Sequence, residues 1–347
     1  METYLDSISH SLTDLKRFLQ GVDDRAVILS HVDADGLCAA TIVKRFLALE
    51  GVKPRHLFPA KGENAFTQHT MERLRQLDPS SLLVLDLGVM DQTIIPGAPT
   101  LFIDHHRPFG YPKDAIVLSW YGKEPACPTS QVVYDLLARL APLDDLGWLS
   151  AVGTAGDLGS DFVFAQDRGP HRRLKKKDVR EAEVLINSAK RSSAYDISTA
   201  IALLDEADDL SHVVDHRVAG VRLLERYRKE VNREVKRCRH ERPHFSWKVA
   251  IVPFKSRCEI QGLIAETWRR QLGNYLVIAA NFGYIDKKVA YVVRTELDTS
   301  VIDFMESLRP AGYRGHVVFG HDRAAGAVLD KNVWLRLSER MRFKDTG

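Results

Sequence analysis

The sequence predicts an α/β fold with a doubly wound, mainly parallel sheet and a smaller C-terminal α/β domain. From about residue 26 to residue 155, short apolar runs alternate with segments of helical spacing. This alternation is typical of βαβ units and a parallel sheet. After about residue 245 the pattern changes, and Gly312, Gly315, Gly320 and Gly326 fall close together. A chain of 347 residues is long enough for two domains.

The expected elements follow the apolar runs and the turn signals between them. In the first part, strands are predicted at 26–30, 55–58, 81–86, 100–104 and 115–118, and helices at 37–49, 66–77, 130–140 and 146–155. Residues 178–204 have a polar helical pattern, and 212–239 read as one long basic helix that Pro243 stops. In the last part, strands are expected at 248–252, 275–281 and 289–296, and a helix at 261–271. We therefore predict a catalytic domain over 1–195, a helical connector over 196–244 and a substrate-binding domain over 245–347.

Composition excludes several classes of protein. The formal net charge of +3 is too small to indicate nucleic-acid binding by itself. Lys and Arg do cluster at 168–177 and 217–242, where a cationic track and an ordinary solvated face are equally good interpretations. The four cysteines form no CxxC pair, which fits a reducing cytoplasm. The N-terminal segment lacks a signal-peptide core, and no apolar run approaches the roughly 18 residues of a membrane span.

Four segments carry carboxylates or imidazoles, and three of them directly follow or end a predicted strand. They are His31-Val32-Asp33-Ala34-Asp35-Gly36, Asp86, Asp104-His105-His106 and Asp157. Open α/β sheets bind ligands at the carboxyl ends of their strands. Carboxylates and imidazoles suit Mn²⁺ or Mg²⁺ better than thiolate-bound zinc.

The combination predicts a centre for two metal ions. Such a centre binds both the attacking and the leaving oxygen of a phosphoryl transfer and needs a bridging carboxylate. Asp86 is the candidate bridge because it lies between the other groups in sequence, and Gly36 lets the backbone turn into the next helix. Each segment alone also fits a loop, a helix cap or a structural histidine pair. The ordered set favours the metal interpretation.

These residues resemble the DHH phosphoesterase superfamily, most closely its RecJ-like, archaeal-type single-strand exonucleases. The matching motifs are His31-x-Asp33-x-Asp35-Gly36, Leu85-Asp86-Leu87-Gly88, Asp104-His105-His106-x-Pro108, Gly153-Thr154-x-x-Asp157 and Gly320-His321-Asp322-Arg323-Ala324-Ala325-Gly326. The last of these resembles the glycine-rich loop of the DHH-associated C-terminal domain. The resemblance implies an active site in the cleft between two domains.

The resemblance also implies roles for individual residues. Two Mn²⁺ ions, or Mg²⁺ in their place, are expected on six ligands: His31, Asp33, Asp35, Asp86, His105 and Asp157. Catalytic roles are expected for His106, Asp104 and Asp33. In this scheme His106 contacts the substrate phosphate, and Asp104 orients His105 by accepting its other ring N–H.

The second domain is expected to hold the substrate. A glycine-rich turn lets backbone N–H groups approach a phosphate. By resemblance, the substrate-binding residues are Arg294, Gly320, His321, Arg323 and Gly326. A strand arginine that faces solvent is the alternative for Arg294.

The expected function is a Mn²⁺-dependent phosphodiesterase that releases mononucleotides from the 5′ end of single-stranded DNA or RNA. The alternative within the same chemistry acts on short substrates, as nano-RNases, pAp phosphatases and linear dinucleotide phosphodiesterases do. A catalytically dead scaffold relative and an inorganic pyrophosphatase fit the residues less well. A cytoplasmic location and no membrane are expected, and the resemblance leaves a homodimer and replication or repair partners open.

Overall fold

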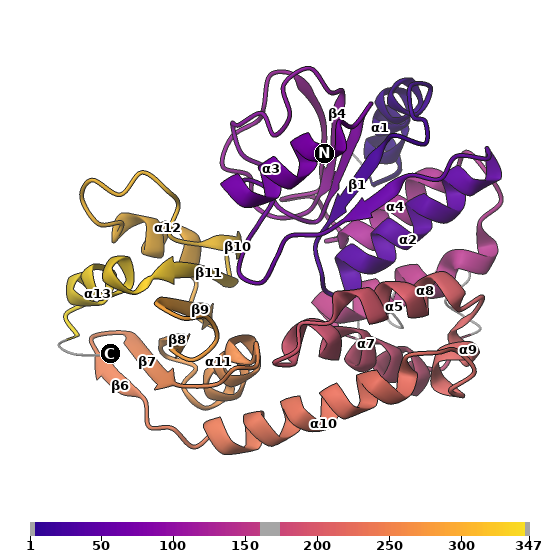
Figure 1. The fold of residues 1–347 in the computed structure, drawn as a ribbon. Coiled ribbons are helices and arrows are strands. Elements are labelled where there is room, and N and C mark those ends of the chain that lie inside the picture. The colour runs from indigo at the N-terminus through magenta and orange to yellow at the C-terminus, as the bar shows by residue number, and fades with distance from the viewer. Residues whose placement is uncertain (1–3, 160–173, 344–347) are drawn as a thin grey trace. The chain divides into compact units, whose positions relative to one another are not determined.

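The computed structural model describes residues 4–159 and 174–343, and the chain divides into two compact units (Figure 1). Unit 1 comprises Met1–Lys190 and Asp196–Glu225, and unit 2 comprises Arg191–Tyr195 and Arg226–Gly347. The segment expected to be a separate connector is thereby shared between the two units. Most of the basic run at 168–177 lies outside the described residues.

Unit 1 is built on a five-stranded sheet in which every strand pairs in parallel, as predicted. Its order is β2-β1-β3-β4-β5. The strands are β1 (Val27–Ser30), β2 (Arg55–Leu57), β3 (Leu82–Leu85), β4 (Thr100–Asp104) and β5 (Ala115–Ser119). The strands β1, β3 and β4 are buried along their whole length. Continuous apolar runs are typical of parallel strands that are covered on both faces.

Helices cover both faces of this sheet, which confirms the doubly wound class (Figure 1). On one face Leu74 of α3 packs with Val27, Leu82 and Phe102 of the strands. On the other face α2 contacts β1 and β3, and α4 contacts β4. The helices of this unit are α1 (Tyr4–Leu19), α2 (Ala34–Leu49), α3 (Gln68–Leu77), α4 (Thr129–Leu137), α5 (Gly147–Leu158), α7 (Lys176–Arg191), α8 (Ile197–Glu206) and α9 (Leu210–Val214).

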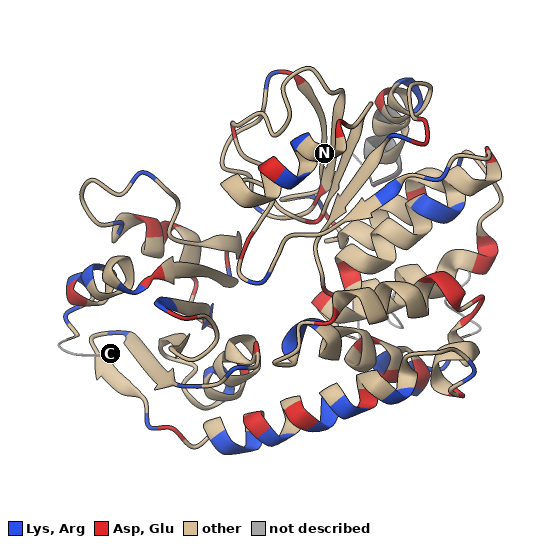
Figure 2. Cartoon of the chain, viewed as in Figure 1, with Lys and Arg blue, Asp and Glu red and all other residues tan. Residues whose placement is uncertain are grey.

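The single long helix expected over 212–239 is wrong, because the structure has two helices there. The short helix α9 begins at its cap Asp209, and α10 spans Val221–Cys238. His216 and Gly220 between them have φ of 58° and 86°, which is left-handed backbone that interrupts a helix. Along α10, seven Lys and Arg alternate with three Glu, so its surface carries both signs of charge (Figure 2).

Unit 2 contains a six-stranded mixed sheet of order β10-β11-β9-β8-β7-β6. Only β7 and β8 pair in parallel, and the other neighbours are antiparallel. The elements are β6 (His244–Ser246), β7 (Val249–Phe254), α11 (Gln261–Gln271), β8 (Leu276–Asn281), β9 (Lys288–Thr295), α12 (Val301–Ser307), β10 (Phe319–His321), β11 (Ala324–Asp330) and α13 (Lys331–Arg340). The smaller α/β domain is thus confirmed, with more antiparallel pairing than the sequence indicated.

The segment expected to be a glycine-rich loop is a β-hairpin instead. Gly320 lies in β10 with φ 135°, and Gly326 lies in β11. A Cβ atom on Gly320 would stand 2.7 Å from the carbonyl oxygen of Ala324, and one on Gly326 would stand 2.5 Å from that of Tyr291. These glycines therefore allow three strands to approach closely.

The described helices include none whose length and apolar character would let it cross a lipid bilayer. All four cysteines belong to the described residues and are buried, and no disulfide joins them.

Candidate metal centre

Strand register brings the predicted ligands together at one edge of the unit 1 sheet. Ser30 of β1 pairs with Leu85 of β3, and Leu85 pairs with Ile103 of β4. The next residue on each strand is His31, Asp86 or Asp104. These three therefore lie side by side at the carboxyl edge, where α/β sheets bind ligands.

The beginning of α2 adds two carboxylates to this edge. Asp33 is the N-cap of α2, and its Oδ1 accepts a hydrogen bond from the backbone N–H of Gly36 at 3.2 Å. Asp35 is fully buried and accepts the backbone N–H groups of Thr129 and Ser130, at 2.8 and 2.9 Å. These two donors lie in the first turn of α4, where N–H groups lack intrahelical partners. Asp35 is therefore fixed by the start of a second helix.

Gly36 is required here because the backbone comes close to it. A Cβ atom at this position would lie 2.6 Å from the carbonyl oxygen of His31. We expect Gly36→Ala to lower the free energy of unfolding by about 1–3 kcal/mol, because the overlap is with backbone rather than with a flexible side chain. Urea denaturation measures this effect. Gly262→Ala, also near a helix start but with nothing within 4 Å, is the matched control and should change stability little. Equal stability of the two variants would contradict the steric account.

Asp86 is the centre of the cluster. It is 2% exposed and has φ 65°, an unusual backbone conformation for a residue other than glycine. Its Oδ1 lies 3.3 Å from His105 Nε2 and accepts a hydrogen bond from the Thr129 hydroxyl at 3.0 Å. Its Oδ2 lies 3.4 Å from His31 Nδ1. The two carboxylate oxygens thus face different imidazoles, as expected for a bridging ligand.

His105 connects Asp86 to the last predicted ligand, Asp157. His105 Nε2 lies 2.9 Å from Asp157 Oδ2 and 3.9 Å from Asp35 Oδ2. Asp157 stands in the last turn of α5, a helix that packs against α2. The structure therefore brings all six predicted ligands into one cluster.

Asp104 was predicted to orient His105, but in the structure it contacts His106 instead. Asp104 Oδ1 accepts the backbone N–H of His106 at 2.7 Å and lies 3.2 Å from His106 Nδ1. Asp104 Oδ2 accepts the backbone N–H of Gly88 at 2.7 Å. Because its carboxylate faces the second histidine of the pair, Asp104 positions His106.

Two residues of α7 also reach the cluster, and sequence reasoning missed both. Lys190 Nζ lies 3.6 Å from Asp33 Oδ2. Asn187 Oδ1 accepts the backbone N–H of Ala34 at 3.0 Å, so that it helps to cap α2. They lie about 150 residues from the first motif in a polar helical stretch, and no local pattern distinguishes them.

The ionisable groups perturb one another strongly. Burial opposes protonation of His31, but the carboxylates of Asp33 and Asp86 together outweigh it and raise the pKa of His31 to about 10. Burial likewise opposes protonation of His105, yet the adjacent carboxylates of Asp157 and Asp86 hold its pKa well above the usual value. Burial opposes ionisation of Asp86, but the imidazoles of His105 and His31 outweigh it and lower the pKa of Asp86. Burial and the charges of Asp86 and Asp157 raise the pKa of Asp35. In the absence of metal, protonated imidazoles thus offset the negative charge of the carboxylates.

The residues fit divalent cations. His31 Nδ1 is buried and lies 2.8 Å from Asp33 Oδ2, yet the two atoms form no hydrogen bond of good geometry. A nitrogen and an oxygen that approach in this way can share a cation between them. Among the described residues of unit 1, three groups of side chains could each hold one ion, and Asp86 belongs to all three: His31 with Asp33 and Asp86, Asp35 with Asp86 and His105, and Asp86 with Asp104 and His106. Oxygen and imidazole donors match Mn²⁺ and Mg²⁺.

Metal affinity is expected to rise with pH. An imidazole must lose its proton to bind a metal, and the pKa of His31 is about 10, so metal competes with that proton at neutral pH. Each proton displaced should lower the Kd for Mn²⁺ by about tenfold per pH unit. Titration calorimetry between pH 6 and 8, in buffers of different ionisation enthalpy, measures both the affinity and the protons released. An affinity independent of pH, with no proton release, would contradict this account.

The predicted substrate residues all lie on unit 2. Arg294 of β9 pairs in register with Ala324 of β11, which in turn pairs with His321 of β10. The arginine and the histidine therefore stand at the same level of β9 and β10, with β11 between them. Arg294 also lies 3.4 Å from Glu266 of α11. Arg323 forms an exposed ion pair with Asp298 at 2.8 Å.

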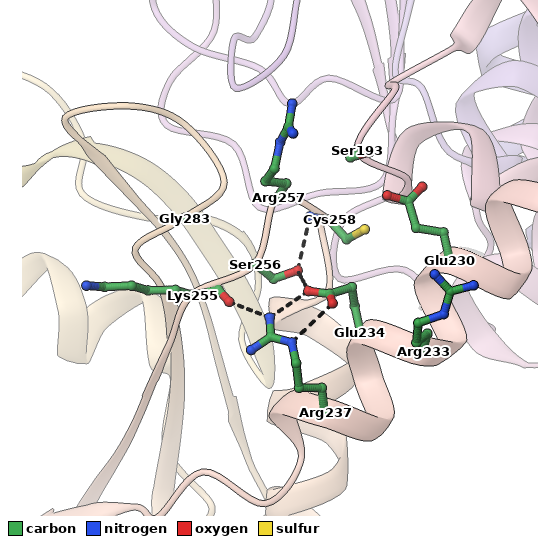
Figure 3. A pocket seen from close by; sticks show the side chains of 10 residues that line it. All are labelled: Ser193, Glu230, Arg233, Glu234, Arg237, Lys255, Ser256, Arg257, Cys258 and Gly283. Carbon is green, nitrogen blue, oxygen red and sulfur yellow. Dashed lines mark hydrogen bonds and ion pairs between the residues drawn. The ribbon is translucent and has the colours of Figure 1, made fainter.

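Unit 2 also contains a charged hollow of about 410 Å³ that sequence reasoning did not identify (Figure 3). On one side Glu234 and Arg237 of α10 form an ion pair at 2.6 Å, and the Ser256 hydroxyl donates to Glu234 at 2.7 Å. The side chains of Lys255 and Arg257 extend away from this pair (Figure 3). The lining residues include four Lys and Arg and two Glu. This excess of positive charge favours anions.

A comparison with protein families gives a match within the first unit. The model of the DHH family, N-terminal domain, matches residues 25–154. No curated protein matches the chain.

Solved structures share the fold over nearly the whole chain. RecJ in complex with Mn²⁺ from Thermus thermophilus superimposes with a TM-score of 0.66 and 20% identity, over 99% of this chain and 56% of that chain. An exonuclease RecJ bound to manganese gives a TM-score of 0.63 and 18% identity, over 98% of this chain and 95% of that chain. The DHH domain of a member of the S1p family of ribosomal proteins gives 0.66 and 13%, over 98% and 91%. The chain thus spans about half the length of the first of these proteins.

Proposed function

We propose, because residues 25–154 match the model of the DHH family, N-terminal domain, that the chain is a phosphodiesterase that uses two Mn²⁺ ions to release mononucleotides from the 5′ end of single-stranded nucleic acid. The coarser assignment, a DHH-type phosphoesterase, follows from the family match and the RecJ-like fold. The choice of ion and of substrate is our proposal.

One observation carries the proposal: in the part of unit 1 that the structure describes, Asp86 belongs to every group of side chains that could hold an ion. A carboxylate shared in this way can bridge two ions, and paired ions stabilise both the attacking and the leaving oxygen when they are bound. Asp35 and Asp33 are positioned by helix starts, so the ligands are arranged before any ion binds. Such preorganisation avoids the cost of ordering the site during reaction.

His106 is the residue that we assign to the substrate phosphate. It is one-fifth exposed, whereas His105 beside it is buried. Asp104 accepts its backbone N–H and raises the pKa of its ring against the opposing effect of burial. A protonated, partly exposed imidazole can donate to a phosphate oxygen and stabilise the charge that develops there.

The cationic side chains of unit 2 favour a nucleic-acid strand, rather than a free phosphate monoester, as the substrate. Arg233, Lys255 and Arg257 line the hollow of Figure 3 beyond the Glu234–Arg237 ion pair. A nucleic-acid backbone is bound chiefly through such contacts to its phosphates. Cytoplasmic location, a homodimer, and replication or repair partners remain predictions of the resemblance.

The test is a time course with Mn²⁺ and a 3′-labelled single strand that carries a 5′-phosphate, beside a labelled dinucleotide. A descending ladder on the long strand is the expected result. Cleavage of the dinucleotide alone would replace the exonuclease by an enzyme of the nano-RNase type. No cleavage of either substrate, from protein that binds Mn²⁺, would overturn the proposal.

A further inference from the structure

Two large aromatic side chains are exposed at the free edge of the unit 2 sheet. β6 is the edge strand, and it joins β7 through a two-residue turn, because Ser246 pairs with Val249. Phe245 on β6 is 53% exposed, and Trp247 in the turn is 77% exposed. The Phe245 ring packs edge-to-face on Tyr275, with centroids 5.2 Å apart. Exposed apolar side chains that gather at one place are typical of an interaction site, whereas single ones are common on any surface.

The backbone of the turn is unfavourable for tryptophan. Trp247 has φ 54°, a value at which hairpin turns favour Gly, Asn or Asp. Arg342, after α13, also has a positive φ of 63°, and its guanidinium lies 4.6 Å from the centre of the Trp247 ring. Two strained residues thus form one exposed cation–π pair. Residues held in such conformations are enriched at functional sites.

Positive charge surrounds the aromatic side chains. The segment from Arg239 to Lys248 contains three Lys and Arg, two His and a single acidic residue, Glu241. Arg242, His244, Lys248 and Arg342 are all exposed. A second copy of the chain, related by a two-fold axis, would bring these cations against the same cations. A polyanion with flat apolar groups is the complementary partner.

We propose that the aromatic hairpin, defined as Phe245, Trp247, Tyr275 and Arg342, is a platform on which bases of single-stranded nucleic acid stack. That this strand is also the substrate rests on the proposed function. The platform itself is a separate binding site on unit 2. Rings at the surface accept any base because every base has an apolar face, and the adjacent cations contact the phosphates. The hairpin therefore binds a strand with little preference for sequence.

The test measures binding without turnover, by fluorescence anisotropy of labelled oligo(dT) in EDTA. Removing one stacking ring typically weakens binding by roughly tenfold or more, so we expect this loss for Trp247→Ala. Trp247→Phe retains a ring and should restore most of the affinity. Leu49→Ala removes another exposed apolar side chain, on unit 1, and is the control, with unchanged affinity. Thermal unfolding of each variant shows whether it is folded.

Salt dependence separates stacking from charge. The slope of log Kd against log salt should be unchanged in Trp247→Ala, because no phosphate contact is lost. Lys248→Gln should reduce that slope by about 0.7, the value for one phosphate contact with a single strand.

Each outcome supports or overturns one idea. Wild-type affinity in folded Trp247→Ala would overturn the platform, even if the wild-type protein degrades strands. Strand binding that depends on Trp247, in a protein that hydrolyses no phosphodiester, would support the platform and refute the proposed function. If Trp247→Ala instead converts a dimer to a monomer in sedimentation experiments and binds strands normally, the hairpin is a self-association surface and the proposal fails.

Discussion

Asp86→Asn is expected to abolish phosphodiester hydrolysis, with a loss of about 10³-fold or more. The carboxylate belongs to all three candidate ion-binding groups of unit 1 and faces His31 and His105 with different oxygens. An amide keeps the shape but offers one oxygen, so it cannot bridge two ions. Bound ions supply several kcal/mol of stabilisation to the transition state, and 1.36 kcal/mol corresponds to tenfold in rate. The rate of hydrolysis with Mn²⁺ and the number of bound Mn²⁺ ions, measured by titration calorimetry, should both fall.

A matched control exists for the same substitution. Asp78 also has a positive φ, 44°, but its side chain is 93% exposed and lies in the turn after α3. Asn tolerates this backbone conformation, so both variants should fold. Asp78→Asn should keep full activity and the wild-type number of ions. If Asp86→Asn retained two ions and more than about a tenth of the activity, Asp86 would not be the bridging ligand.

The sequence predicts the first unit well because its determinants are local. The strands β1, β3 and β4 are short, mainly apolar runs, and a ligand directly follows each of them, as His31 follows β1 and Asp86 follows β3. Parallel register then brings these positions together without further information. For this reason the six expected ligands meet in one cluster.

Other features depend on contacts that no local pattern records. Lys190 and Asn187 reach the cluster only because α7 packs beside the start of α2. Asp104 faces His106 because the backbone turns after β4, which spacing alone does not determine. Glycines 320 and 326 indicated a loop, yet close approach of strands explains them in a hairpin. Similarly, His216 adopts a left-handed conformation that interrupts the expected long helix.

The exposed aromatic hairpin was also not predictable. An alternating Phe245-Ser246-Trp247 pattern fits a strand with one buried face, and strand–turn statistics do not favour tryptophan at positive φ. Phe245 is exposed on the edge strand β6, and Trp247 is exposed in the turn that follows it. By contrast Trp120, directly after β5 in unit 1, is buried.

His106→Ala separates substrate contact from metal binding. We expect kcat to fall by about 10²–10³-fold, the usual cost of removing a donor that stabilises developing charge. The number of bound Mn²⁺ ions should stay the same, because His31, Asp33, Asp35, Asp86, His105 and Asp157 are all retained. His69→Ala, which removes an exposed histidine paired with Glu63, is the control and should leave both quantities unchanged.

The same variant also tests the geometry around Asp104. His106 belongs to one of the three candidate ion groups, together with Asp86 and Asp104. Loss of one ion in His106→Ala would therefore make His106 a ligand rather than a contact to the phosphate.

Asp104→Asn keeps an acceptor for the His106 backbone N–H but loses the charge that raises the pKa of the His106 ring. If His106 acts as a proton-bearing donor, Asp104→Asn should lower kcat more at pH 8 than at pH 6, because the ring loses its proton at a lower pH. A uniform loss across this range would leave Asp104 with a purely structural role.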